Sequence, residues 1–174
     1  MFYILICGIF LFFSKKNIKF VAKLKIGFNM SIELKKYLGK WFEICRIPAG
    51  FESDMQYVTA EYTLNNDKTI KVINSGYIDN ELKSIEGVAV PTDKDDLFKV
   101  SFYPNIYSDY KILAITDDYT YSLVGGSSSD YLWILGRTDT IPRRIFDWFV
   151  FIGNKEGYNI NKLEITKGYG ISAE

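Results

Sequence analysis

The sequence predicts an all-β fold: an eight-stranded antiparallel up-and-down β-barrel with one C-terminal α-helix and a short final strand. Segments of alternating apolar and polar residues, bounded by turn residues, recur at spacings of about 8–12 residues, which is typical of all-β domains. Aromatic residues make up 17% of the chain, with 13 Tyr and 13 Phe, and these residue types favour strands. The 174 residues suffice for one domain with a sizeable core.

The segment 37–51 is expected to open the barrel as one long strand. A short helical stretch over residues 32–37 leads into it, and Pro48 ends the ladder because proline has no N–H to donate. Burying the Trp41 indole contributes on the order of 2–3 kcal/mol. Because side chains alternate along a strand, every second residue is expected on the same face. One face is expected to carry Trp41, Glu43, Cys45 and Ile47.

The other seven barrel strands follow in order and are separated by turn residues. They are expected over residues 56–64, 69–77, 82–90, 97–103, 108–115, 119–125 and 129–137. Pro91 is expected to stop the fourth strand. Eight strands close into a barrel just wide enough for one small ligand, and closure removes exposed sheet edges.

A helix is expected over residues 142–154, with Thr140 as its N-cap and Pro142 in its first turn. A final strand over residues 158–166 is expected at the open seam of the barrel. The helix carries more apolar residues than one barrel-facing stripe requires. Its surplus apolar surface is interpreted as either a wider contact with the barrel, or a contact with a membrane surface or a second copy.

Charge and residue types exclude several function classes. Lys plus Arg and Asp plus Glu both number 21, so the net charge is zero and argues against nucleic-acid binding. Histidine is absent, which removes histidine bases and histidine metal ligands. We therefore expect neither a metal nor a cofactor. Cys45 is expected to be a small buried hydrophobe rather than a reactive thiol.

Residues 1–29 are expected to lie apart from a barrel domain of residues 30–174. The apolar run over residues 2–13 is too short for a comfortable membrane span and suits the core of a signal peptide. Lysines follow the run rather than precede it, which favours a membrane anchor. Ile6 is too bulky for an ordinary lipidation site at Cys7. The chain is thus secreted or membrane-associated, or it starts at Met30 in the cytosol. Asn29 begins a glycosylation sequon that matters only after export.

Three motifs bear a family resemblance. Gly39-Lys40-Trp41 is similar to the Gly-x-Trp motif of the lipocalins. Thr116-Asp117-Asp118-Tyr119 resembles their Thr-Asp-x-Tyr turn, in which Asp117 is expected to cap turn amides. Arg137 ends the last barrel strand, where the family has an arginine. The resemblance covers residues 33–168 and is strongest to the bacterial lipocalins and their apolipoprotein D relatives.

The resemblance implies an eight-stranded barrel that holds a small apolar ligand. It also implies that Arg137 packs over Trp41 and so joins the first and last strands by a cation–π contact of order 1–2 kcal/mol. Parity and the family pattern predict six ligand-contacting side chains. These are Trp133, Tyr110, Phe102, Val100, Tyr121 and Tyr62. Glu43 is expected to bond tyrosine hydroxyls inside the barrel.

The leading hypothesis is a non-catalytic protein that carries or stores a fatty acid, lysophospholipid or similar amphiphile. One alternative is an isomerase-type enzyme, for which Cys45 and Glu43 are the only interior candidates. Without histidine, no common base is present to activate the thiol. A second alternative is an interaction module that uses the apolar helix.

Overall fold

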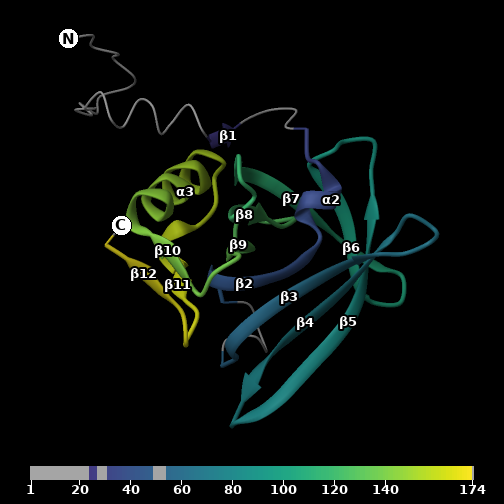
Figure 1. The fold of residues 1–174 in the computed structure, drawn as a ribbon, viewed down its shortest axis with the longest axis horizontal. Coiled ribbons are helices and arrows are strands. Elements are labelled where there is room, and N and C mark those ends of the chain that lie inside the picture. Colours follow the sequence, from purple (N-terminus) through teal and green to yellow (C-terminus); the bar gives the residue numbers. More distant parts are fainter. Residues whose placement is uncertain (1–23, 27–30, 49–53, 174) are drawn as a thin grey trace.

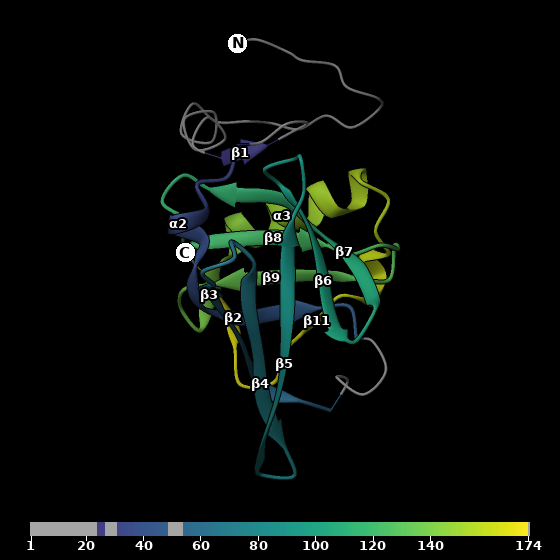
Figure 2. The ribbon, with the colours of Figure 1, turned by 90° about the vertical axis from the view of Figure 1, so that its right-hand side faces the viewer.

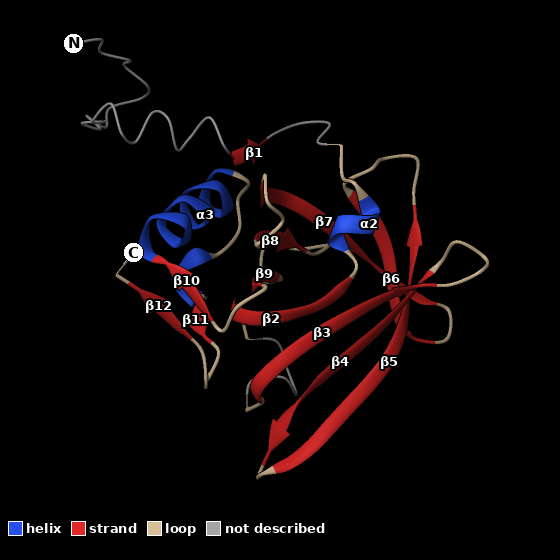
Figure 3. Cartoon of the chain, in the orientation of Figure 1, coloured by secondary structure: helices blue, strands red, loops and turns tan. Residues whose placement is uncertain are grey.

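The chain folds as a closed β-barrel with one long helix packed against its outside (Figure 1). The computed structural model describes residues 24–26, 31–48 and 54–173. The apolar run over residues 2–13, Cys7 and the sequon at Asn29 lie outside these residues. Strands dominate the described part of the chain (Figure 3).

Eight strands make the barrel, each antiparallel to the next, and β9 pairs with β2 to close it. They are preceded by the short helix α2, Leu34–Tyr37. The strands are β2 (Gly39–Arg46), β3 (Gln56–Leu64), β4 (Ile70–Ile78), β5 (Glu81–Pro91), β6 (Leu97–Tyr103), β7 (Ile106–Thr116), β8 (Tyr121–Gly125) and β9 (Leu132–Gly136). The predicted barrel is therefore confirmed. The β4–β5 hairpin projects beyond the other strands (Figure 2).

The prediction that Pro91 stops the fourth strand is confirmed, with the strand running one residue past the predicted end at residue 90. Pro91 is the last residue of β5 and pairs with Phe98 of β6. A proline at the end of a strand is tolerated where its missing N–H leaves no ladder bond unmade.

The predicted face of β2 is interrupted by a bulge. Pairing with β9 shifts register between Glu43 and Cys45. Trp41 therefore lies in the cluster inside the barrel, whereas Cys45 and Ile47 lie in the cluster between barrel and helix. A bulge inserts one unpaired residue, so the alternation of side chains restarts beyond it. The expectation that Trp41, Cys45 and Ile47 share one face was wrong for this reason.

The C-terminal part forms a second, outer layer. Helix α3, Arg143–Lys155, has Pro142 as its N-cap, and Thr140 lies in β10, Thr140–Pro142. Thr140 is therefore not the cap. Strand β10 pairs in parallel with β12, Gly170–Ser172.

The predicted final strand is much shorter than expected. The 3₁₀ turn η2, Ile160–Lys162, interrupts it and leaves only β11, Glu164–Ile165. Strand β11 pairs with Arg46 and Cys45 at the end of β2. Strand β3 pairs only with the first half of β2, so β11 occupies the backbone groups that β3 leaves.

Strand β1, Leu24–Ile26, falls within the segment that the sequence sets apart from the barrel. It pairs with residues 114–116 of β7, beyond the point where β6 stops pairing with that strand. The segment before Met30 thus adds one short strand to the barrel sheet.

Helix α3 covers the outer core. Phe149, Ile145 and Ile152 are buried against side chains of β2, β7, β8 and β9. Phe146 and Trp148 are partly buried against the same cluster, and Phe151 is 40% exposed. In the described part of the chain, no helix combines the length and apolar character needed to span a membrane.

Candidate functional site

One end of the barrel is closed by Arg137 and Trp41. The guanidinium carbon of Arg137 lies 3.8 Å from the centre of the Trp41 ring. Its Nη1 donates to the carbonyl of Lys40 at 2.7 Å, and its Nη2 donates to the carbonyls of Tyr37 and Leu38 at 3.0 and 2.9 Å. The predicted contact between the first and last strands is therefore present. A planar guanidinium suits this role because it stacks and donates several fixed hydrogen bonds at once.

Local backbone geometry places these groups. Gly39 has a φ of 92°, a conformation that glycine adopts without strain, and it brings β2 close under Arg137. The Trp41 indole N–H donates to the Tyr37 carbonyl at 2.8 Å, which ties the ring to α2. The Gly39-Lys40-Trp41 motif thus fixes both the Trp41 ring and the segment that leads into β2.

The turn between β7 and β8 is capped by a different aspartate from the one predicted. Asp118, not Asp117, caps it: the Asp118 carboxylate accepts from Thr116 Oγ1 at 2.6 Å and from the Thr120 N–H at 3.0 Å. Asp117 is exposed. Tyr119 is buried, and its hydroxyl accepts the Glu33 N–H at 2.9 Å. The turn therefore packs against the segment before β2.

Three tyrosines line the interior near this closed end. The Tyr110 hydroxyl is hydrogen-bonded to those of Tyr37 and Tyr62, at 2.7 and 2.8 Å. Burial raises the pKa of Tyr37 to about 12 and raises the pKa of Tyr62 and Tyr110 well above the ordinary value. All three are therefore neutral at physiological pH and act as hydrogen-bonding groups. The sequence prediction missed Tyr37, because it lies in α2 rather than on a strand.

The interior of the barrel is apolar and aromatic. A cavity of about 10 Å³ lies beside Tyr62, Tyr110 and Val100, three of the predicted wall residues. Phe102 and Trp133 pack against the same cluster and are only partly buried. Trp133 pairs with Arg46, at the end of β2 opposite Gly39. Five of the six predicted side chains are thus brought together inside the barrel.

Tyr121 is the exception. It packs against the cluster beneath α3, and its hydroxyl is hydrogen-bonded to Thr138 Oγ1 at 3.2 Å. Val124, three residues further along β8, lies in the interior cluster. Because side chains alternate along a strand, Tyr121 must face the opposite side. Its predicted role in the wall was wrong.

A buried ion pair joins two side chains in the second half of β2. Arg46 Nη1 donates to Glu43 Oε1 at 2.8 Å, and both side chains are almost fully buried. Arg46 Nη2 also donates to the carbonyl of Met55 at 2.9 Å, and Thr166 Oγ1 lies 3.4 Å from the same Glu43 oxygen. The structure thus gives Glu43 an ion pair with Arg46, which the sequence did not predict.

Asn74 adds a polar point to the wall of β4. It alternates with Val72, which lies in the interior cluster, so its side chain shares the inner face. Its Oδ1 is buried and has no hydrogen-bond partner among the described residues. A buried polar atom of this kind is costly unless something hydrogen-bonds to it. The signal in the sequence is a lone amide at an inward position of an apolar strand.

Cys45 offers no reactive group. Its side chain is fully buried, and burial together with the Glu43 carboxylate raises the pKa of the thiol to about 12. A thiol nucleophile reacts as the thiolate, which this environment disfavours. Within the described residues, no cluster of His, Cys, Asp or Glu has the arrangement of a metal site.

Comparison with known proteins agrees with this architecture. The sequence model of the lipocalin-like domain matches residues 32–168. The chain is a lipocalin. It is 40% identical over 136 residues to the outer membrane lipoprotein Blc of Vibrio cholerae, covering 75% of this chain and 80% of that protein. It is 32% identical over 147 residues to mouse apolipoprotein D, covering 78% and 77% of the two chains.

A solved structure shares the fold of this lipocalin. The crystal structure of the cockroach allergen Per a 4 superposes with a TM-score of 0.63 over 85% of this chain and 94% of the allergen. The two sequences are 22% identical, so this likeness shows the fold alone. The bacterial and apolipoprotein D branch, predicted from the motifs, is confirmed by the sequence relatives.

Proposed function

We propose that this lipocalin carries or stores a small hydrophobic ligand, a fatty acid, lysophospholipid or similar amphiphile, inside its barrel. The observation that carries the proposal is the closed barrel itself, apolar and aromatic within and blocked at one end by Arg137 over Trp41. Burying an acyl chain in such an interior contributes about 0.8 kcal/mol per methylene. The similarity to apolipoprotein D supports a lipid as ligand.

The acyl chain of the ligand is proposed to enter the barrel at the end opposite Arg137 and Trp41. Phe102 and Trp133 lie toward that end and are partly buried. Deeper in the barrel, the cavity beside Tyr62 and Tyr110 has a volume of about 10 Å³, room for little more than a water molecule. Ligand binding therefore requires these side chains to change rotamer. Val100, Tyr62 and Tyr110 would then contact the tail, and the Asn74 amide would meet a polar atom of the ligand.

The test is a fluorescence titration of the purified protein with oleate and with lysophosphatidylcholine. We expect a saturable, one-to-one change in indole emission that the Trp133→Phe variant loses while still binding the ligand. The matched control is Trp148→Phe, which alters an indole on helix α3 and should leave the change intact. The absence of a saturable response to any amphiphile, with the protein folded, would refute the proposal.

The enzyme alternative is not favoured by its two candidate groups, Cys45 and Glu43. The raised pKa of Cys45 and the pairing of Glu43 with Arg46 leave neither side chain suited to nucleophilic or acid–base work. Turnover that disappears in Cys45→Ala, with ligand binding intact, would establish the alternative.

We also propose that helix α3 and the residues before the barrel bring the protein to a membrane surface. Trp148 and Phe151 stack with centroids 5.2 Å apart, and the Lys155 ammonium lies 5.7 Å from the Phe151 ring. Aromatic residues flanked by cations favour the membrane interface. The Vibrio cholerae relative is named as an outer membrane lipoprotein, which supports this location.

Flotation with anionic vesicles tests the membrane contact. We expect the full chain to float, residues 30–174 to float more weakly, and Phe146→Ser with Phe151→Ser to lose the residual binding. Self-association that the same two changes abolish, without flotation, would instead assign the helix to a homodimer. A chain that begins at Met30 in its host and stays in the cytosol would contradict a membrane role.

A further inference from the structure

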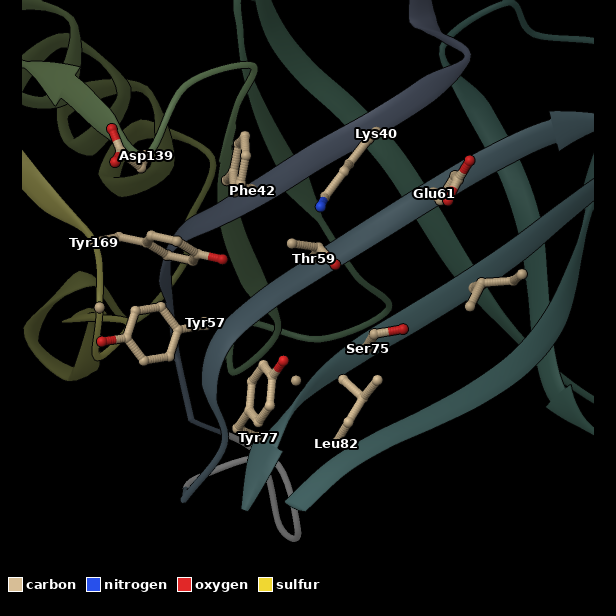
Figure 4. A pocket seen from close by; sticks show the side chains of 13 residues that line it. Lys40, Phe42, Tyr57, Thr59, Glu61, Ser75, Tyr77, Leu82, Asp139 and Tyr169 are labelled. Carbon is tan, nitrogen blue, oxygen red and sulfur yellow. The ribbon is translucent and has the colours of Figure 1, made fainter. Parts of the chain in front are cut away.

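A second hollow among the described residues lies outside the barrel. It has a volume of about 560 Å³ and is lined by side chains of β2 to β5 and of the segment before β12 (Figure 4). Lys40 and Phe42 line it, and they flank the inward-facing Trp41 on β2. Because side chains alternate along a strand, the hollow occupies the outer face of the sheet. We call it the outer groove; the proposed lipid site does not include it.

Four aromatic rings form an arc along one side of the outer groove: Phe42, Tyr169, Tyr57 and Tyr77 (Figure 4). Successive ring centres are 5.6, 6.2 and 6.3 Å apart, and successive planes meet at 76–88°. Thr59 of β3 lies on the inner side of this arc (Figure 4). The arc brings four π systems to one side of the hollow, one each from β2, β3, β4 and the segment before β12.

The ring of Tyr57 is held in place at a conformational cost. Tyr57 has a φ of 52°, which is unusual for a bulky residue, and it lies at a bulge between β3 and β4. Its ring packs against Gly168, where an added Cβ would lie 2.4 Å from the ring. The Tyr169 hydroxyl donates to the Val58 carbonyl at 2.9 Å, which fixes the neighbouring ring. Strain retained at one exposed side chain points to a function for that side chain.

The charges of the outer groove favour a cation. The carboxylates of Glu61 and Asp139 line it against the single ammonium of Lys40. No ion pair within the described residues uses either carboxylate. The Lys40 ammonium lies 5.3 Å from the centre of the Phe42 ring, so one face in the groove already accepts a cation.

We propose that the outer groove binds a quaternary ammonium group of the choline type. Several aromatic rings within about 6 Å of a cation each attract it through their quadrupoles, and trimethylammonium groups are recognised in this way. Such a group has apolar methyls to fill an aromatic hollow and a charge that the two carboxylates complement. The group belongs either to a free small molecule or to the headgroup of a phosphatidylcholine surface.

The test is a titration of the ¹⁵N-labelled full chain with choline chloride, followed by amide shifts at Gly168 and Tyr77. The control ligand is 3,3-dimethylbutan-1-ol, which has the shape of choline without its charge, at matched ionic strength. We expect choline to bind at least about tenfold more tightly than the neutral alcohol, since the charge supplies most of the attraction.

Two variants make the test specific. Tyr57→Asn removes one ring and tolerates the positive φ, so the backbone should be retained. Combined with Tyr77→Leu, it should weaken choline binding about tenfold or more. The matched control, Leu82→Ala, removes an apolar side chain from the same groove and should leave the affinity within about twofold. Oleate binding inside the barrel should be unchanged in each of these variants.

Vesicles of dioleoylphosphatidylcholine distinguish the two sources. Saturable shifts with choline itself assign the site to a free ligand, and shifts only with the vesicles assign it to a headgroup; both support the proposal. Equal binding of choline and the neutral alcohol would show a merely apolar hollow. That result, or the absence of any saturable shift with choline and with vesicles, would overturn the proposal.

Discussion

Replacing Arg137 by lysine tests the contact that closes the barrel. The substitution keeps the positive charge and removes the planar fork that stacks on Trp41 at 3.8 Å. Arg137 donates to four backbone carbonyls within 3.0 Å, those of Lys36, Tyr37, Leu38 and Lys40. A single ammonium has three donors on one atom and cannot reach all four while it also lies over the ring.

The expected loss of stability is about 3 kcal/mol. The stacked cation–π contact contributes about 1 kcal/mol for a half-buried guanidinium. The two part-buried bonds, to Tyr37 and Leu38, contribute about 1 kcal/mol each, and the two exposed bonds add less. With a denaturant slope near 2 kcal/mol per M, the urea midpoint should fall by about 1.5 M.

Urea unfolding of the wild type and the Arg137→Lys variant, followed by circular dichroism, measures this loss. The matched control is Arg143→Lys, since Arg143 forms an exposed pair with Asp147 at 3.8 Å on helix α3. Exposed pairs contribute little, so the control should change stability by less than about 0.5 kcal/mol. If Arg137→Lys lies within the same range as the control, the guanidinium does not hold the first and last strands together.

Three further predictions concern Cys45, the buried ion pair and the turn between β7 and β8. Folding raises the pKa of Cys45 from 9.0 to about 12, so the unfolded thiol releases its proton first and stability should fall as pH rises between those values. In the folded protein, iodoacetamide should label Cys45 at pH 8 only as fast as the protein unfolds. Peptide mass mapping of the labelled cysteine would measure that rate. Glu43→Gln should cost about 3–5 kcal/mol in urea unfolding because it removes the carboxylate that pairs with the buried Arg46 guanidinium, and Arg46→Met added to it should recover part of that loss. Asp118→Ala should lower stability by about 1 kcal/mol and Asp117→Ala by less than about 0.5, and equal effects would contradict the assignment of the turn cap.

The barrel could be predicted because the sequence features that indicate it are either local turn residues or motifs shared with the lipocalin family. Turn residues mark the strands, and the motifs around Trp41 and Arg137 lie almost a hundred residues apart at the two strands that close the barrel. Interior positions followed from alternation wherever a strand is regular. Trp133, predicted as a wall residue, accordingly shares the interior face of β9 with Leu135.

The errors arose where alternation breaks or where a partner is distant in sequence. The bulge after Glu43 moved Cys45 to the outer core and let Arg46 pair with Glu43, and no residue there marks a bulge in the sequence. Tyr121 faces outward because it shares its side of β8 with Leu123, which lies in the cluster beneath α3, whereas Val124 faces the interior. The outer groove depends on Tyr57 and Tyr169, more than a hundred residues apart, which meet only after the C-terminal segment folds back on β3.

The location of a bound lipid tests the central claim most directly. Isotope-filtered NOE spectra of the protein with one equivalent of ¹³C-labelled oleate would report which side chains touch the acyl chain. We expect contacts from the methylenes to the rings of Trp133 and Phe102 and to the methyls of Val100, all saturating at one ligand per chain. Contacts confined to Phe146 and Phe151 on helix α3 or to the outer groove would contradict a ligand held inside the barrel.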